Sequence, residues 1–196
     1  MNDAGIVVGE DGVPRCSWGD STTDYRAYHD DEWGRPVHGD HALFERITLE
    51  AFQSGLSWLT ILRKRPAFRS AFAGFDPDAV AEYGDAHVET LMADAGIVRN
   101  RRKIEATITN ARALVTLRSK EGEGALDRLL WSFAPAKRQR PRRMSEVPSS
   151  TPQSIALSKA LKAGGFVFVG PTTMYAAMQA CGLVDDHVAG CHRAAG

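Results

Sequence analysis

Signals for helix starts and stops recur every ten to fifteen residues along this chain, and no segment shows the sustained alternation that marks a strand. Asp76 followed by Pro77 is one such start, and Gly84 is the matching stop. Asp40 and Thr151 are expected to cap two further helices, and Ser21, Thr22 and Thr23 are the possible caps of a short helix that carries Tyr25. The pattern predicts an all-α fold of many short helices, including 58–72 (broken or kinked near Pro66), 85–95, 99–119, 122–133, 154–163 and 172–181, with a last turn or two over 185–191.

The size of the chain suits a small globular protein. Its 196 residues can bury a core as one domain or as two small helical lobes. No apolar run is long enough to cross a membrane, and the first residues hold acids and glycines rather than a secretory signal. Three cysteines without a signal argue against a disulfide framework. We therefore expect a cytoplasmic protein with a flexible leader over 1–14 and a single domain over 15–196.

The stretch 43–65 begins as an amphipathic helix that carries an acid on its apolar face. Glu50 shares that face with Ala51 and Ser54. A carboxylate is expensive to bury unless something pairs with it. The helical-wheel projection alone favours a Glu50 carboxylate that reaches water at the edge of the apolar face. The alternative is a pocket with Glu50 in its wall and Trp58 as its floor or lid.

The two ends of the chain carry a possible metal site. Two thiols and two imidazoles form a closed tetrahedral ligand set for zinc, which would be structural because no position is left for water. His187 and Cys191 are four residues apart, so a helical turn would put both on one face. The ligands would be Cys16, His29, His187 and Cys191. The alternatives are residues with no metal, or other histidine ligands, namely His38, His41, His87 and His192.

Positive charge is local, since the formal net charge is zero. Gly96 lies between two expected helices and precedes a basic cluster, a combination that suits a phosphate grip by backbone N–H groups and a helix dipole. It is similar to a helix-hairpin-helix DNA-binding element, although an ordinary turn with a basic face is the alternative. The basic residues are Arg99, Arg101, Arg102 and Lys103. A second cluster is expected to be solvated loop charge: Lys137, Arg138, Arg140, Arg142 and Arg143.

Aromatic residues gather in sequence around the same acid. Most aromatic side chains belong to a core, but aromatic faces beside a carboxylate suit a flat, electron-poor heterocycle, through stacking and cation–π attraction. The set is Trp18, Tyr25, Tyr28, Trp33 and Trp58, around Glu50.

Long motifs in these regions closely resemble the 3-methyladenine DNA glycosylase I family. They include RCSW, YHDDEWGRP, LFERITLEAFQSGLSWLTILRKR, DAGIVRNRRKIEATITNA, WSF and LSKALKAGGFVFVGPTTMYAAMQACGLVDDH. With the closing cysteine, the resemblance runs in the family's order from Arg15 to Cys191. It implies a helix-hairpin-helix DNA glycosylase fold and a base excision repair enzyme. Such an enzyme hydrolyses the N-glycosidic bond of 3-methyladenine in alkylated double-stranded DNA, leaving an abasic site.

The resemblance also implies the functional residues. One structural Zn²⁺ would be held by Cys16, His29, His187 and Cys191. The base pocket would be formed by Trp18, Tyr25, Tyr28, Glu50 and Trp58, and Gly55 and Leu56 would enter the gap in the duplex. Nothing in the sequence calls for more than a monomer.

The expected chemistry gives Glu50 a binding role. 3-Methyladenine in DNA is already cationic and a good leaving group, so no general acid is needed, while an anionic Glu50 would favour the cation over neutral adenine. The wider superfamily uses a catalytic aspartate, whereas the family that this chain resembles lacks an aspartate at that place.

The chain departs from the family at several positions. Asp185 stands where Asn is usual, Ala51, Phe52 and Ser54 replace Gly, Gln and Ala, and the leader is longer. Two rival interpretations remain. One is a metal-dependent hydrolase built on histidine–acid pairs, namely His29, Asp30, Asp186 and His187. The other is a zinc-stapled DNA-binding protein without activity.

Overall fold

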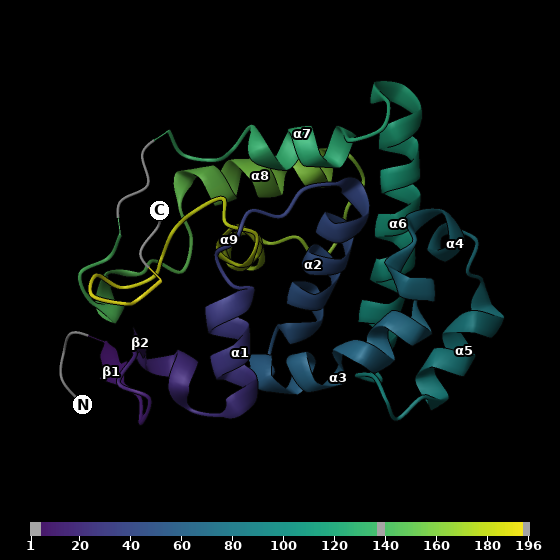
Figure 1. Ribbon diagram of the computed structural model, residues 1–196. Coiled ribbons are helices and arrows are strands. Elements are labelled where there is room, and N and C mark those ends of the chain that lie inside the picture. The colour runs from purple at the N-terminus through teal and green to yellow at the C-terminus, as the bar shows by residue number, and fades with distance from the viewer. Residues whose placement is uncertain (1–4, 137–139, 194–196) are drawn as a thin grey trace.

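Helix α2 (Asp40–Gln53) runs through the middle of the molecule in the computed structural model, which describes residues 5–136 and 140–193 (Figure 1). On one side, the long helix α6 is covered by two short helices, α4 and α5. On the other side α8 packs against α9, and α9 against α2. The helices in contact with α2 are α3 (Trp58–Ala71), α6 (Arg101–Glu121), α7 (Ala125–Trp131) and α9 (Pro171–Ala180).

The remaining elements lie at the edges of this arrangement. α1 packs against α3 and against a 3-10 helix, η1, that precedes it. None of the helices over the described ranges is both long enough and apolar enough to traverse a bilayer. The bounds are η1 (Ser17–Asp20), α1 (Thr23–Asp31), η2 (Ala73–Phe75), α4 (Pro77–Ala81), α5 (Asp85–Ala93), η3 (Met144–Glu146) and α8 (Pro152–Ala163).

A continuous cluster of buried apolar side chains joins α2 to the helices around it. Aromatic rings make up much of its centre, and ring contacts run from Phe52 through Phe68 and Phe72 to Phe75. Full burial of one such side chain stabilises the fold by about 2 kcal/mol. This cluster fixes the position of α2, and therefore of the acid that α2 carries.

The all-α class is confirmed, and several predicted caps are present. The side chains of Thr22, Asp76 and Thr151 each accept a backbone N–H at the start of α1, α4 and α8. The predicted role of Asp40 is wrong. Its carboxylate accepts the backbone N–H groups of Gly124 and Asp127, so it caps α7 rather than its own helix.

Three other expectations differ from the structure. α3 continues through Pro66 without a break in its helical assignment. Residues 185–191 form no helix, and only one hydrogen-bonded turn, at 189 and 190, lies within them. Within the expected flexible leader, β1 (Ile6–Val8) pairs antiparallel with β2 (Pro14–Cys16), and Ile6 is opposite Cys16. Residues 1–4 of that leader lie outside the described ranges.

Candidate functional site

Four buried side chains from the two ends of the chain converge on one point. The ligand atoms of Cys16, His29, His187 and Cys191 all lie within 4.8 Å of one another. Cys191 Sγ is 3.5 Å from His29 Nε2 and 3.7 Å from His187 Nδ1, and Cys16 Sγ is 3.9 Å from the same His187 nitrogen. The predicted set therefore comes together, although His187 and Cys191 do so from a loop and not from a helical turn.

The second nitrogen of each imidazole has a partner of its own. His29 Nδ1 is 2.8 Å from Asp30 Oδ1, and His187 Nε2 is 3.2 Å from the carbonyl oxygen of Trp33. Such outer contacts fix the ring orientation of a metal-binding histidine. With its free nitrogen directed at the thiols, each ring is oriented as a ligand would be.

One of the two thiols is predisposed to metal binding, whereas the hydrogen bond to Cys191 and burial raise the pKa of Cys16. A hydrogen bond from Cys16 lowers the pKa of Cys191 against the opposing effect of burial, and both imidazoles add to the lowering. A thiolate is the form that binds metal. Two sulfurs and two nitrogens at this spacing match a tetrahedral zinc set, so these residues could hold a metal ion. Of the competing histidines, His192 contacts Asp30 from outside the cluster.

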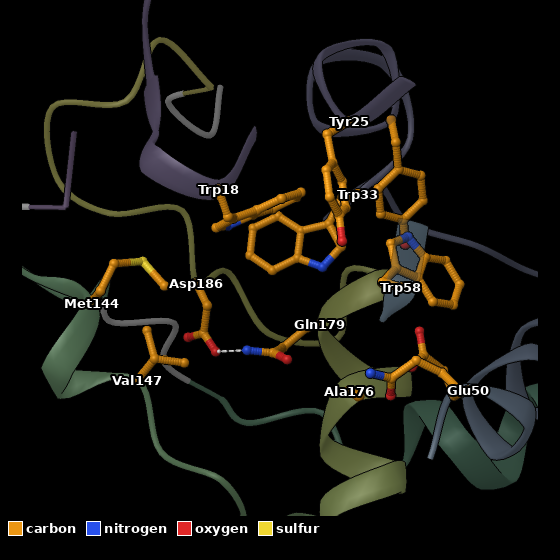
Figure 2. A pocket seen from close by; sticks show the side chains of 12 residues that line it. Trp18, Tyr25, Trp33, Glu50, Trp58, Met144, Val147, Ala176, Gln179 and Asp186 are labelled. Atoms are coloured by element: carbon orange, nitrogen blue, oxygen red, sulfur yellow. Dashed lines mark hydrogen bonds between the residues drawn. The ribbon is translucent and has the colours of Figure 1, made fainter. Parts of the chain in front are cut away.

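A pocket of about 290 Å³ opens beside this cluster (Figure 2). Its wall combines aromatic rings from the N-terminal segment and α3 with polar side chains from α2, α9 and the 185–193 segment. The aromatic and apolar lining residues are Trp18, Tyr25, Tyr28, Trp33, Trp58, Met144, Val147 and Ala176, and the polar ones are Glu50, Gln53, Gln179 and Asp186. All five residues predicted for the base pocket line it.

Glu50 is the pocket's distinctive group. It is 6% exposed, and its carboxyl group forms no hydrogen bond or ion pair with any other residue in the described part of the chain. Burial raises its pKa to about 8, even though the cation of Arg46, one helical turn earlier, lowers it. A pKa of about 8 favours the protonated carboxyl at pH 7 in the free protein, and the expected anion, which concerns the complex with a cationic base, stays a prediction. The edge-of-helix interpretation is wrong, because the side chain is enclosed.

The aromatic rings are braced against one another. Trp18 makes edge contacts with Tyr25 and Trp33, at centroid distances of 5.8 and 4.9 Å, and Tyr28 lies 5.3 Å from Trp58. The Tyr25 hydroxyl accepts the backbone N–H of Leu59, which ties α1 to the start of α3. These contacts hold in place the aromatic rings that line the pocket.

Polar residues on the opposite side of the pocket were missed. Gln179 and Asp186 lie side by side in Figure 2, with Gln179 between Asp186 and Glu50. One carboxylate oxygen of Asp186 accepts hydrogen bonds from Gln179 and from the buried Tyr175 hydroxyl, at 2.7 and 2.6 Å. Asp186 thus faces the pocket and not the thiols, which removes the main support for the hydrolase interpretation. No local pattern marks Gln179, and Asp186 stands out only as an acid next to a metal-ligand candidate.

The turn between α2 and α3 presents an exposed leucine. Gly55 has φ +81°, a left-handed conformation that glycine adopts without strain, and Leu56 is 40% exposed. Ser54 is exposed because α2 ends at Gln53, so it does not share the buried face as the wheel suggested. The Gln53 amide donates to the Leu56 carbonyl oxygen, which connects the pocket wall to the turn.

The expected hairpin lies between α5 and α6. Gly96 packs so closely on α3 that a Cβ there would meet the Ala67 methyl at 3.0 Å, and its N–H is already bonded to Asp94. Arg99 and Arg102 are exposed, while Arg101 pairs with Glu89 at 2.7 Å.

Lys103 corrects the predicted basic cluster. Its side chain is buried, and Nζ donates to the carbonyl oxygens of Phe52 and Ser54 at 2.8 and 2.6 Å. It therefore offers no exposed cation to a phosphate.

The second basic cluster is largely paired. Arg140 donates to Asp185 at 2.6 Å, so the charge of the unusual aspartate is compensated. Arg142 and Arg143 both approach Glu146. Lys137 and Arg138 lie outside the described residues.

Comparison with known proteins gives a consistent set of relatives. A family model described as methyladenine glycosylase matches residues 18–194. The DNA-3-methyladenine glycosylase 1 of Escherichia coli (strain K12) is 50% identical over 181 residues, covering 91% of this chain and 96% of that protein. The DNA-3-methyladenine glycosylase of Haemophilus influenzae is 46% identical over 180 residues, covering 90% and 96%.

Solved structures agree with these matches. A crystal structure of a 3-methyladenine DNA glycosylase I superposes with a TM-score of 0.87 at 45% identity, covering 92% of this chain and 100% of that one. A structure on 3-methyladenine recognition by the Staphylococcus aureus 3-methyladenine DNA glycosylase I gives 0.84 at 34% identity, covering 91% and 95%. The helical fold of this chain is the fold of those structures.

Proposed function

The chain belongs to the methyladenine glycosylase family, and from that membership we propose that it is a DNA repair enzyme acting on alkylated double-stranded DNA. The enzyme flips 3-methyladenine out of the helix and hydrolyses its N-glycosidic bond. It releases the free base and leaves an abasic site. We propose that it does so as a monomer, in the cytoplasm.

The observation that carries this proposal is the pocket around Glu50. Two carboxyl groups and a set of aromatic faces line it, and no Lys, Arg or His is among its lining residues. Buried carboxyl groups normally have partners, so an unpaired one aimed into a cavity points to a ligand that supplies hydrogen-bond donors. A flat cationic heterocycle fits both the faces and the charge.

The reaction needs little from a general acid. As the bond between the sugar and the base breaks, its electron pair leaves with the base and neutralises the positive charge there. Water then adds to the anomeric carbon of the sugar and loses a proton. The enzyme's task is to take the base out of the stack, which costs less for a damaged base, and to hold it.

We propose that Trp58 and Tyr28 stack on the flipped base, with Trp18 and Tyr25 completing the wall. Glu50 accepts hydrogen bonds from the edge of the adenine. Because its pKa of about 8 leaves it neutral in the empty pocket, the arriving cation would favour loss of its proton. Neutral adenine carries no charge that would offset the free energy needed to ionise the buried Glu50, so the pocket would favour the alkylated base.

DNA contacts are proposed for two surface elements. Gly55 and Leu56 enter the gap that the flipped nucleotide leaves, since Leu56 is an exposed apolar residue beside the pocket wall. The α5–α6 hairpin with Gly96, Arg99, Arg101 and Arg102 binds backbone phosphates.

The metal is proposed to be one structural zinc ion held by Cys16, His29, His187 and Cys191. A closed set of four protein ligands leaves no coordination position for water, so the ion contributes stability and no step of the reaction.

The test is incubation of the protein with methylated duplex DNA, followed by chromatography of the released bases. We expect free 3-methyladenine and abasic sites in equal amounts. Binding of methylated DNA without base release would overturn the proposal and favour a zinc-stapled DNA-binding protein. Chelation that stops turnover in protein that is still folded would favour a metal-dependent hydrolase.

A further inference from the structure

Lys103 sits at the junction of the two elements proposed to contact DNA. It is in the first turn of α6, directly after the α5–α6 hairpin, and is 7% exposed. Its ammonium group reaches across to α2 and donates to the carbonyl oxygens of Phe52 and Ser54. These carbonyls belong to the end of α2, where helical backbone partners run out.

A second lysine makes the reverse connection. Lys64, on α3, donates to the carbonyl oxygens of Ala95 and Gly96 in the hairpin, at 2.8 and 3.1 Å. One ammonium thus runs from α6 to the 54–57 turn, and the other runs from α3 to the hairpin. The turn that presents Leu56 and the hairpin that follows α5 are held at a fixed spacing by two charged hydrogen-bonding groups.

We infer that Lys103 is a positioning residue, which fixes the 54–57 turn against the α5–α6 hairpin so that Leu56 enters the duplex while the hairpin holds the backbone. The inference rests on the proposed function. It gives Lys103 the role of positioning the turn, in place of the phosphate contact that the sequence predicted for it.

The physical reason is the cost of leaving the α2 end unsatisfied. Without the ammonium group, two carbonyls close to the buried core lose a charged donor, and hydrogen bonds to charged groups are stronger than neutral ones. Gly55 gives the turn little conformational preference of its own. A loosened turn would let Leu56 sample positions that do not match the gap in the DNA.

The experiment is a double-mutant cycle with Lys103→Met and Leu56→Ala, measured as the single-turnover rate of 3-methyladenine release from methylated duplex DNA. We expect each single variant to be slower by about tenfold, and the double variant to be no slower than Leu56→Ala alone, because Lys103 acts through Leu56. An additive loss of about a hundredfold would overturn the inference.

Two further measurements separate positioning from other roles. Affinity for free 3-methyladenine should stay within about twofold in Lys103→Met, because the pocket faces Glu50 and Trp58; a fall parallel to the rate would make Lys103 a pocket residue instead. Lys159→Met, at an exposed position of α8, is the matched control and should release base at the normal rate. If the unmodified protein released no 3-methyladenine, the proposed function itself would fail. That result differs from an active protein with an additive cycle.

If Lys103→Met does not fold, Ser54→Pro and Gly55→Ala provide a second route, because they alter the turn while the lysine remains. Each should slow base release from DNA and leave affinity for the free base unchanged. Normal release by both variants would show that the geometry of the turn is irrelevant and would overturn the inference.

Discussion

Glu50 makes the free protein less stable at alkaline pH, because the folded state must then hold an unpaired buried anion. In the unfolded chain this carboxyl ionises near its ordinary pKa of 4.5, whereas burial raises the pKa to about 8 in the fold. Between these values the folded state binds more protons than the unfolded state. The free energy of unfolding therefore falls as pH rises through this window.

Glu50→Gln should remove that loss. We expect the variant to match the original protein below about pH 4.5 and to be more stable above pH 8, by on the order of a few kcal/mol. Urea unfolding across pH 4 to 9 measures this. Glu45→Gln, on the same helix but paired with Arg69 at the surface, is the matched control and should show no alkaline gain. Parallel pH profiles for Glu50→Gln and the original protein would contradict the assignment of an unpaired buried acid.

Trp58 and Leu56 lie two residues apart, but their substitution should impair different properties, namely affinity for the free base and release of the base from DNA. Trp58→Ala removes a stacking face, worth about 1–3 kcal/mol, so affinity for free 3-methyladenine should fall roughly tenfold to a hundredfold. Leu56→Ala should leave that affinity unchanged, because Leu56 does not line the pocket. It should instead slow release of the base from duplex DNA. Isothermal titration with the free base, beside a release assay on DNA, distinguishes the two; equal behaviour of both variants would count against this division.

At the scale of elements, the α5–α6 hairpin should bind DNA through only part of its basic sequence. Arg99 and Arg102 are exposed, Arg101 is paired with Glu89, and Lys103 is buried. Each of Arg99→Ala and Arg102→Ala should weaken binding of undamaged duplex and lower the slope of log K against log salt by about one. Arg101→Ala should have a smaller effect. An unchanged slope in all three variants would show that these arginines are solvated surface charges that do not contact phosphates.

The positions of the helices were predictable because caps and stops are local signals. Asp76, Thr22 and Thr151 act within three residues of themselves, so the sequence is enough to identify them. Asp40 has the same chemistry but caps α7, more than eighty residues away, because Gly39 occupies the N-cap position of α2 and tertiary packing brings the start of α7 to the Asp40 carboxylate. Lys103 was misassigned for the same reason, since a basic run does not reveal which member turns inward.

The site was predictable to a similar degree. Cys16, His29, His187 and Cys191 could be proposed from residue chemistry, and the family resemblance pointed to Glu50 and the aromatic residues. Gln179 and Asp186 reach the pocket from α9 and from an irregular segment, so no helical or strand period marks them. The β1–β2 pair was missed because two three-residue strands are too short to show alternation.

At the scale of the whole molecule, the metal-ligand cluster and the pocket share a wall. The Trp18 ring meets the His29 ring edge-on at 5.2 Å, and the Trp33 ring meets His187 at 4.7 Å. Both tryptophans also line the pocket, whereas Glu50 and Trp58 stand on α2 and α3 within the main core. The ends of the chain therefore support one side of the pocket, and the central helices support the other.

Loss of the proposed zinc ion should accordingly affect binding as well as stability. Cys191→Ser should abolish stoichiometric zinc, lower the melting temperature and weaken affinity for free 3-methyladenine, since the Trp18 side of the pocket loses its support. Cys181→Ala is the matched control, because this third cysteine is buried at the C-terminal end of α9 and lies outside the ligand cluster. It should keep one zinc per chain. Metal analysis, thermal unfolding and titration with the base, all on the same samples, test this. A metal-free variant that binds the base normally below its melting temperature would confine the cluster to stability and leave the pocket to α2 and α3.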